Sequence, residues 1–337
     1  TIIKNFLTYS KSLAKLKYLG STLAKTAPLI MCSLSILFAY KVGMFNICAA
    51  GQYVVGAGAS LYFALALQMP WYVCMLAAVA AGALWGAISG ALKAYCNVNE
   101  VISCIMLNWI GLYLVNSLLI KVKETTSPYT LPIANTSPGS VIPSCGLNKL
   151  FSNNQYVTIA IPLAVVIAVL IWIVLSKTQF GYELKATGNN PNAAKYCGMN
   201  EKRNLILTMV ISGALAGLGA AMLYLTGFEQ WQTTQSSVPS MGFNGISAAF
   251  LGGLNPIGSV FSSFFIEHIT IGGAYVDKTM YSAQISDLIS SLIIYLCAFV
   301  LFLKYAMNKY LAHRDERRAE KTAALAEAES GKGGAQA

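Results

Sequence analysis

The chain has 337 residues, of which 56% are hydrophobic and only 11% are charged, and its formal net charge is +10. Soluble domains carry roughly 25% charged residues, so this composition excludes an ordinary water-soluble globule and indicates that the lipid bilayer is the solvent. The positive charge does not indicate a nucleic-acid partner, because the basic residues lie at the chain ends and between apolar runs, as membrane topology places them. We therefore expect an all-α, polytopic membrane protein.

Residues 1–25 are basic and precede the first apolar run. Their spacing allows an amphipathic helix on the membrane surface. Loop alternation places this segment outside the cell, against the rule that basic loops stay inside. A helix that runs outward before Thr1 would explain why this segment lies outside, but not why it is basic. We expect that such a helix is missing from this numbering. The lysines are Lys4, Lys11, Lys15, Lys17 and Lys25.

Seven apolar stretches are candidates for membrane spans, since a spanning helix needs about 20 residues. Several are rich in Gly and Ala, as in "ISGALAGLGAAML", and small residues let helices approach closely in lipid. We interpret these patches as ordinary helix packing. The predicted spans are Thr26–Tyr40 extended into Val42–Phe45, Gly51–Leu67, Trp71–Leu92, Val101–Ile120, Tyr156–Leu175, Leu205–Thr226 and Asp287–Tyr305.

Basic residues in segment 176–204 and in the tail indicate that both lie in the cytoplasm. Alternation then places the long polar loop 121–155 and the loop Phe228–Met241 outside. It places the connections Lys41–Asn46 and Tyr95–Glu100 inside, and Gln68–Pro70 outside. The predicted organisation is a transmembrane domain over 26–306, with an external loop at 121–155 and a cytoplasmic loop at 176–204. A cytoplasmic tail, 307–337, is basic and then rich in Ala, Glu and Gly.

The cytoplasmic segment contains "FGYELKATGNNPNAAKYCGMNEKRN", whose centre has the signals of a short helix. Asn190 can cap it, Pro191 suits its first turn, and Gly198 can end it. Such a helix, bordered by basic residues, could fit a groove on a separate motor subunit. The alternative is a solvated loop helix with no partner.

Gly242–Gly273 is apolar but interrupted at Gly252-Gly253 and at Asn255-Pro256. Proline removes a backbone donor and disfavours helix in the residue before it. We predict two half-helices that dip into the membrane and return, and the alternative is one kinked span. "FN" followed by small residues occurs both in Met44–Ser60 and here, which suggests an inverted repeat as in transporters or a chance similarity.

The sequence contains no motif for catalysis or metal binding that we can identify. There is no G-x-x-x-x-G-K-[ST] loop, G-x-S-x-G elbow, H-E-x-x-H helix or C-x-x-C pair among the eight cysteines. Glu267 and His268 form a polar pair in an apolar segment, for which we expect a hydrated position near the membrane surface. Asn99 before Glu100 is expected to be a helix cap rather than a ligand. We therefore expect no catalytic residue, no metal site and no cofactor bound by this chain.

Four segments, in their order and spacing, resemble the permease subunits of bacterial ABC importers for simple sugars and nucleosides, a group that includes the ribose and branched-chain amino acid permeases. They are "FNICAAGQYVVGAGA", "NEVISCIMLNWIGLYLVN", "GYELKATGNNPNAAKYCGM" and "ISGALAGLGAAM". The resemblance covers about Ala27 to Tyr305, and the nucleoside branch is the most similar. Where family members usually read "FNIG-x-EGQ", this chain has Cys48 for the Gly and Ala50 for the acid, so a role for that acid is in doubt.

The resemblance implies a type II importer fold and a multi-pass location in the bacterial cytoplasmic (inner) membrane. It implies two cytoplasmic ATPase subunits that hold ATP and Mg²⁺, a second permease subunit of the same or a different chain, and an external substrate-binding lipoprotein. It also implies that the loop around Gly188–Met199 is the coupling helix that docks on the ATPase. The residues assigned to it are Gly188, Asn190, Pro191, Ala193, Ala194, Lys195 and Gly198.

Neutral amides and hydroxyls in the spans are candidates for the substrate path, because they can guide an uncharged polar solute. For each amide the alternative is an interhelical hydrogen bond, worth roughly 0.6 kcal/mol on average. The candidates are Asn46, Gln52, Asn108, Asn116, Asn244 and Ser247.

The favoured function is an ATP-driven importer subunit for nucleosides, with purine nucleosides preferred. The first alternative keeps the machine but carries a simple sugar such as ribose or galactose. Alternatives of a different class are a secondary transporter driven by an ion gradient and a structural membrane scaffold.

Overall fold

The computed structural model describes residues 13–273 and, beyond them, residues 288, 291, 292, 295, 296, 299, 306–311 and 314. The chain divides into two units, Thr1–Ser290 and Ser291–Ala337, and in the second unit residues 306–311 are helical. The predicted span Asp287–Tyr305 and the predicted tail 307–337 lie outside the described residues apart from these isolated positions. The fold below is that of the first unit.

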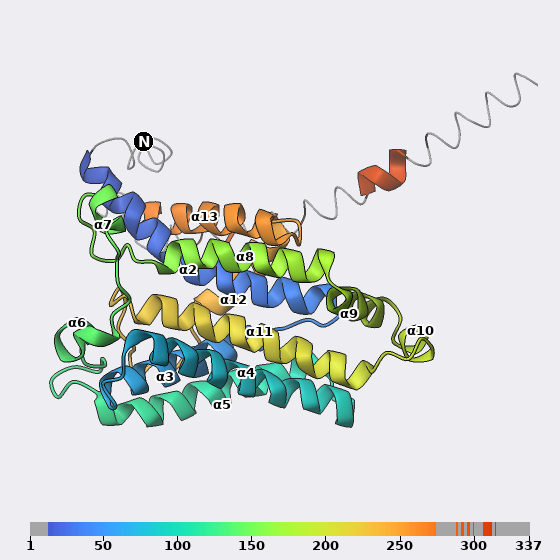
Figure 1. Ribbon diagram of the computed structural model, residues 1–337, viewed down its shortest axis with the longest axis horizontal. Coiled ribbons are helices and arrows are strands. Elements are labelled where there is room, and N and C mark those ends of the chain that lie inside the picture. The colour runs from blue at the N-terminus through green and yellow to red at the C-terminus, as the bar shows by residue number, and fades with distance from the viewer. Residues whose placement is uncertain are drawn as a thin grey trace, which may run out of the picture. The chain divides into compact units, whose positions relative to one another are not determined.

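The first unit is a bundle of long helices that run side by side (Figure 1). Its described residues contain isolated β-bridges but no strand. Five helices among them are long and apolar enough to cross a membrane, and α3, with 17 residues, is shorter than the others. The first six predicted spans are thus found as helices. The long helices are α2 Leu13–Lys41, α3 Ala49–Leu65, α4 Trp71–Cys96, α5 Glu100–Leu119, α8 Ala160–Lys177 and α11 Glu201–Tyr224.

Shorter elements connect these helices. The segment predicted as an external loop holds η1 Ile120–Val122, α6 Ile133–Thr136, η2 Pro138–Ser140 and α7 Leu147–Leu150. The remaining helices are α9 Gln179–Asn189, α10 Pro191–Tyr196, α12 Ser240–Leu251 and α13 Pro256–Gly273, of which α13 has 18 residues, as many as α8.

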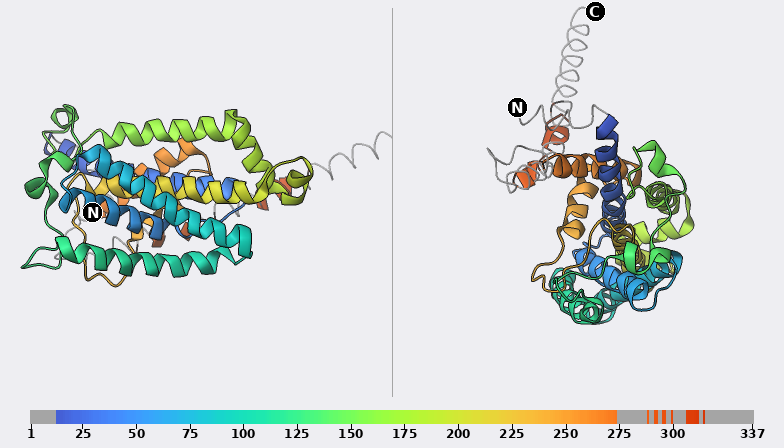
Figure 2. Two further views of the ribbon diagram at one scale, coloured as in Figure 1. Left: turned by 60° about the horizontal axis from the view of Figure 1, so that its bottom comes forward. Right: turned by 90° about the vertical axis from the view of Figure 1, so that its left-hand side faces the viewer.

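Helix α2 is longer than its apolar run. It begins at Leu13, so the expected boundary at residue 25 lies inside one continuous helix. The amide of Asn154 donates to the carbonyl oxygen of Lys17 at 2.6 Å, which ties the first turns of α2 to the long polar loop. The end-on view shows α2 between the α12–α13 pair and α8 (Figure 2, right).

Helices α4 and α11 form the most extensive contact of the bundle, and glycines make it possible. A Cβ atom on Gly82 would collide with the carbonyl oxygen of Gly213, and a Cβ on Gly213 would collide with that of Gly82. Gly86 lies in the same way against the carbonyl of Met209. Because small residues allow backbones to touch in lipid, the interpretation of these patches as helix packing is confirmed.

Contacts between loops agree with the predicted alternation. At one end, Gly188 of the basic segment lies against Gly43, and the Lys202 ammonium lies 5.1 Å from the centre of the Tyr95 ring. At the other end, the amide of Thr130 donates to the carbonyl of Trp231 at 2.9 Å. Loops predicted to share a side therefore lie together, and we call these ends inner and outer after the positive-inside rule.

The break predicted in Gly242–Gly273 is present as α12 and α13. The ring of Phe250 in α12 lies 5.2 Å from that of Tyr40, close to the inner end of α2. Ile266, which lies ten residues after the start of α13, packs with Leu29, which lies eleven residues before Tyr40 in α2. The pair therefore turns near the inner end and runs back, as the sequence predicts, but α13, with 18 residues, is as long as α8 and is not a half-helix.

Candidate functional site

Residues Gln179–Gly198 form a projection at the inner end (Figure 1). We call it the coupling arm, after the coupling helix that the family resemblance implies. The side chain of Asn190 accepts a hydrogen bond from the Ala193 amide at 3.1 Å, and Pro191 occupies the first position of α10. Gly198 follows the helix with a φ of 82°, a conformation that favours glycine. The predicted start and end of the short helix are confirmed.

The first half of the arm, α9, is a helix that the sequence analysis did not define. Thr178 caps it by accepting a hydrogen bond from the Gly181 amide at 3.1 Å. The signal was present, because a threonine before "QFGYELKAT" is a suitable N-cap and most of that stretch favours helix. The helix is amphipathic and buries Gly181, Leu184 and Thr187.

The arm is fixed to two transmembrane helices by contacts that leave little space. A Cβ on Gly188 would collide with the backbone of Val42, and Gly43, with a φ of 77°, lies on the other side of the same contact. The amide of Asn204 in α11 donates to the hydroxyl of Thr187 at 2.9 Å, and both residues are buried. The arm therefore packs directly against the inner ends of α2 and α11.

Most of α10 faces solvent. Of its residues, Ala194 is buried, whereas Pro191, Ala193 and Lys195 are exposed. Tyr196 has 93% of its surface exposed, and the sequence analysis did not select it. A large aromatic side chain on a charged projection is a typical interface anchor, and this exposure could not be read from the sequence.

Two hollows of about 380 and 400 Å³ flank α10. Gly198, Met199 and Asn200 line both of them. The inner surface therefore has a projection, at Tyr196, with a hollow on either side of the following turn. A partner protein could bind to such a surface.

Asn46 and Gln52, two candidates for the substrate path, form one buried pair. The amide of Asn46 donates to the Gln52 carbonyl oxygen at 2.9 Å and to the Ser35 hydroxyl at 3.1 Å. They lie where the chain leaves α2 and enters α3. The structure therefore brings these two together.

Asn108 lies against the same part of α3 but has a structural role. Its side-chain oxygen accepts from the Gly51 amide at 2.8 Å, and its nitrogen donates to the Ile47 carbonyl at 3.1 Å. The first turn of α3 is thereby tied to α5. The alternative of an interhelical bond accounts for this residue.

Asn116 lies nearer the outer end. It accepts from the Trp231 indole nitrogen at 2.9 Å and donates to the Gln235 carbonyl at 3.0 Å. It thus holds the strand-like segment that leads into α12. The indole of Trp231 is buried, with 1% of its surface exposed.

Asn244 and Ser247 lie on α12, and both are half-buried. Gly242, in the first turn of α12, lies against Ala50 so closely that a Cβ would collide with the Ala50 Cα. The two segments of the suspected repeat therefore meet. The six candidates are divided among the start of α3, the outer part of α5 and α12.

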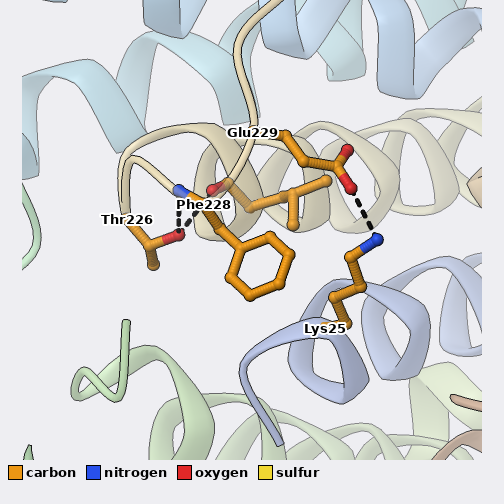
Figure 3. Close-up of polar contacts among 5 residues, drawn as sticks. Lys25, Thr226, Phe228 and Glu229 are labelled. Atoms are coloured by element: carbon orange, nitrogen blue, oxygen red, sulfur yellow. Dashed lines mark hydrogen bonds and ion pairs between the residues drawn. The ribbon is translucent and has the colours of Figure 1, made fainter. Parts of the chain in front are cut away.

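An ion pair fixes the outer half of α2 (Figure 3). The Lys25 ammonium lies 2.6 Å from a carboxylate oxygen of Glu229 and 5.2 Å from the centre of the Phe228 ring. One of the lysines that conflict with the positive-inside rule thus has its charge balanced by a neighbouring carboxylate.

Glu267 does not occupy the expected hydrated position. Only 2% of its surface is exposed, because it lies on the side of α13 that packs within the bundle, together with Ser263 and Ile266. His268 is half-buried. The expectation for Glu267 was wrong because the sequence does not tell which side of α13 faces the protein.

Asn99 is the cap of α5, as expected, and accepts from the Val101 amide at 2.9 Å. At the same place, the Lys93 ammonium lies 2.7 Å from a carboxylate oxygen of Glu100. Asn99 is therefore explained by helix structure.

Comparison with known proteins identifies the class. Residues 18–298 match the family described as "Branched-chain amino acid transport system / permease component". The guanosine ABC transporter permease protein NupP of Bacillus subtilis is 32% identical, over 87% of this chain and 84% of that protein. The nucleoside ABC transporter permease protein NupB of Lactococcus lactis is 33% identical, over 89% and 84%.

A sugar permease is also similar. The galactose/methyl galactoside import permease protein MglC of Haemophilus influenzae is 31% identical, over 72% of this chain and 70% of that protein. No solved structure matches. Since the family match covers most of the chain and the bundle carries five candidate membrane spans among the described residues, this protein belongs to the branched-chain amino acid transport system permease family and is a multi-pass protein of the bacterial cytoplasmic membrane.

Proposed function

We propose that this chain is the membrane-spanning subunit of an ATP-driven importer for nucleosides, with purine nucleosides preferred. Two relatives that cover most of the chain carry guanosine or nucleoside transport in their names. In this proposal the chain is not an enzyme and binds no cofactor. Separate ATPase subunits hold ATP and Mg²⁺, a second permease subunit completes the pore, and an external lipoprotein delivers the solute.

The coupling arm is the observation that carries the proposal. It is solvent-exposed where a partner would bind, at α10, and it is fixed by close backbone contact where force would enter the bundle, at Gly188 and Gly43. A solvated loop helix without a partner would not need that rigid base. The charge and hollows beside α10 suit docking of a cytoplasmic ATPase.

The exposed tyrosine provides a direct test of docking. In the complete importer, Tyr196→Ala should reduce co-purification of the ATPase and lower solute-stimulated ATP hydrolysis at least fivefold, because interface anchors contribute about 1 kcal/mol or more. Tyr129→Ala is the matched control, since it removes a tyrosine 41% exposed at the outer end. Equal effects of the two substitutions, or none from Tyr196→Ala, would refute the docking site.

Disrupting α10 tests the transmission of force. Replacing both Pro191 and Gly198 with valine should uncouple ATP hydrolysis from uptake while membrane insertion stays normal. Valine at 198 conflicts with a φ of 82°. Uptake at the normal rate in this variant would show that the arm is not the lever.

The cargo is tested with the purified external binding protein and labelled solutes. Nucleosides should bind and be imported, and guanosine and inosine should compete with each other, whereas galactose and ribose should not. Preferential import of a sugar would favour the alternative that the galactose permease relative suggests.

The source of energy is tested in the same cells. Uptake should stop when ATP is depleted. Uptake that survives ATP depletion but stops when the ion gradient is collapsed would favour a secondary transporter. Normal uptake after deletion of the chain, with no ATPase co-eluting, would favour a scaffold.

A further inference from the structure

The Asn46–Gln52 pair is buried but not satisfied. Asn46 is 1% exposed and Gln52 is 0% exposed. Among the described residues, the Asn46 Oδ1 and the Gln52 Nε2 atoms have no hydrogen-bond partner. A buried polar atom without a partner is unfavourable by roughly 1–3 kcal/mol, so each atom needs an explanation.

The unsatisfied set is one acceptor and one donor, whichever way the amides point. If oxygen and nitrogen are exchanged in both side chains, Gln52 donates to Asn46, and the Ser35 hydroxyl does too. The exchange then leaves the Asn46 nitrogen as the free donor and the Gln52 oxygen as the free acceptor. Two neighbouring amides therefore always offer one donor and one acceptor.

The pair lies where four helices meet. Ser35 of α2 contacts Asn46, and its carbonyl accepts from the Ser212 hydroxyl of α11 at 2.8 Å. A Cβ on Gly86 of α4 would lie 3.3 Å from the Gln52 nitrogen. This position, at the break between α2 and α3, is at the centre of the bundle rather than at its lipid surface.

Two other buried amides of the spans differ in this respect. Asn108 and Asn116 each use both their oxygen and their nitrogen in hydrogen bonds. An amide that only joins helices can thus be satisfied in this bundle. The Asn46–Gln52 pair instead keeps one donor and one acceptor free.

We propose that the Asn46–Gln52 pair binds the base edge of a purine nucleoside as it passes through the membrane, which deepens the proposed function and rests on it. Hypoxanthine and guanine present N1–H beside the oxygen on C6, and adenine presents its amino group beside N7. Asn and Gln side chains pair with such adjacent donors and acceptors. An uncharged pair of amides suits this solute, because neutral hydrogen bonds are weak enough for the nucleoside to leave again.

The pair is closed in this conformation. Both side chains are buried among α2, α3 and α4, with Ser35 bonded to Asn46 and Gly86 close to Gln52. The solute reaches the amides only after the helices around them move apart.

The test compares inosine with purine riboside, which lacks the C6 oxygen that the free Gln52 donor would bind, as well as the N1 donor. Maximal uptake is measured in proteoliposomes that hold the complete importer, with saturating loaded binding protein, so that the permease step limits the rate. The wild type should transport inosine about fivefold faster, the equivalent of one hydrogen bond of roughly 1 kcal/mol. Gln52→Met should bring this ratio close to one.

Gln230→Met is the matched control, because Gln230 is an exposed glutamine at the outer end. It should leave the ratio unchanged. Gln52→Glu keeps the shape of the side chain if the methionine variant does not fold, and it should also reduce the ratio. A ratio of one in the wild type, or a ratio that Gln52 variants leave unchanged, overturns the inference while nucleoside uptake still supports the proposed function. Absence of any nucleoside uptake by the wild type overturns the proposed function itself.

Discussion

At the level of single side chains, the buried amides of the bundle have two different roles. Asn108 ties the start of α3 to α5 through two hydrogen bonds, whereas Asn46 and Gln52 each retain a free bonding atom. The same residue type therefore serves for stability in one place and is available for a solute in another. All three were selected from the sequence as neutral amides in the spans. Their roles could not be separated there, because the distinction depends on which backbone groups lie opposite.

Asn108→Ala should destabilise the protein. The substitution leaves the Gly51 amide and the Ile47 carbonyl without partners, and a buried group of this kind is unfavourable by about 1–3 kcal/mol. The unfolding midpoint of the purified protein in detergent should fall clearly. Asn192→Ala, at an exposed position of α10, should leave it unchanged. An unchanged midpoint in Asn108→Ala would show that these bonds do not stabilise α3.

At the level of helices, the contact of α4 with α11 and the attachment of the coupling arm are made by backbone rather than by side chains. Gly82 and Gly213 let two carbonyl groups approach the opposite helix, and Gly188 does the same at the arm. These positions tolerate no side chain because the obstacle is main chain, which cannot rotate away.

Gly213→Ala provides a test in which two effects oppose each other. Alanine is a better helix former than glycine by about 1 kcal/mol, but its methyl group would collide with the Gly82 carbonyl. Overpacking typically destabilises by about 1–3 kcal/mol, so the unfolding midpoint should fall. Gly139→Ala meets nothing within 4 Å and should not lower it. A rise in the midpoint of Gly213→Ala would mean that the helices separate without penalty.

The N-cap of α10 provides a second test at the level of helices. Asn190→Ala removes the bond to the Ala193 amide, and loss of an N-cap destabilises a helix by about 1 kcal/mol. A helix of six residues cannot absorb this loss, so α10 should fray. Proteolysis between residues 190 and 198 should become faster in the absence of the ATPase, while Asn190→Ser, which restores a cap, should not differ from the wild type. Equal rates in all three proteins would contradict the cap.

Helix boundaries show where prediction from the sequence succeeds and where it does not. The breaks at Gly252–Pro256 and at Asn190-Pro191 were predicted because proline and glycine act locally, whatever the surroundings. The start of α2 at Leu13 and the helix α9 were not predicted, since both lie outside the apolar runs that define a span. Burial of Glu267 was missed for a different reason, because it depends on which helices α13 contacts.

For the molecule as a whole, the inner and outer ends follow from the basic residues and are supported by contacts between loops. Three cysteines that are exposed among the described residues mark these ends. Cys145 lies in the outer polar loop, whereas Cys96 and Cys197 lie at the inner end. Native thiols can therefore report the orientation of the chain.

An impermeant maleimide should label Cys145 in right-side-out vesicles, and Cys96 and Cys197 in inside-out vesicles. The experiment is done with Cys297 replaced by serine, because that residue lies outside the described part of the chain. Bound ATPase should protect Cys197, which directly follows α10, and should leave Cys145 unaffected. Labelling of Cys197 from the outside would reverse the orientation and remove the basis for cytoplasmic docking.

The glycine contact between α4 and α11 has a mechanical consequence. Main chain touches main chain between these two helices, so sliding one helix past the other would bring backbone atoms into collision. We therefore expect rearrangement at the joints where helices are interrupted, at residues 42–48 and 252–255. A small molecule wedged into either joint should then arrest the protein without binding between α4 and α11.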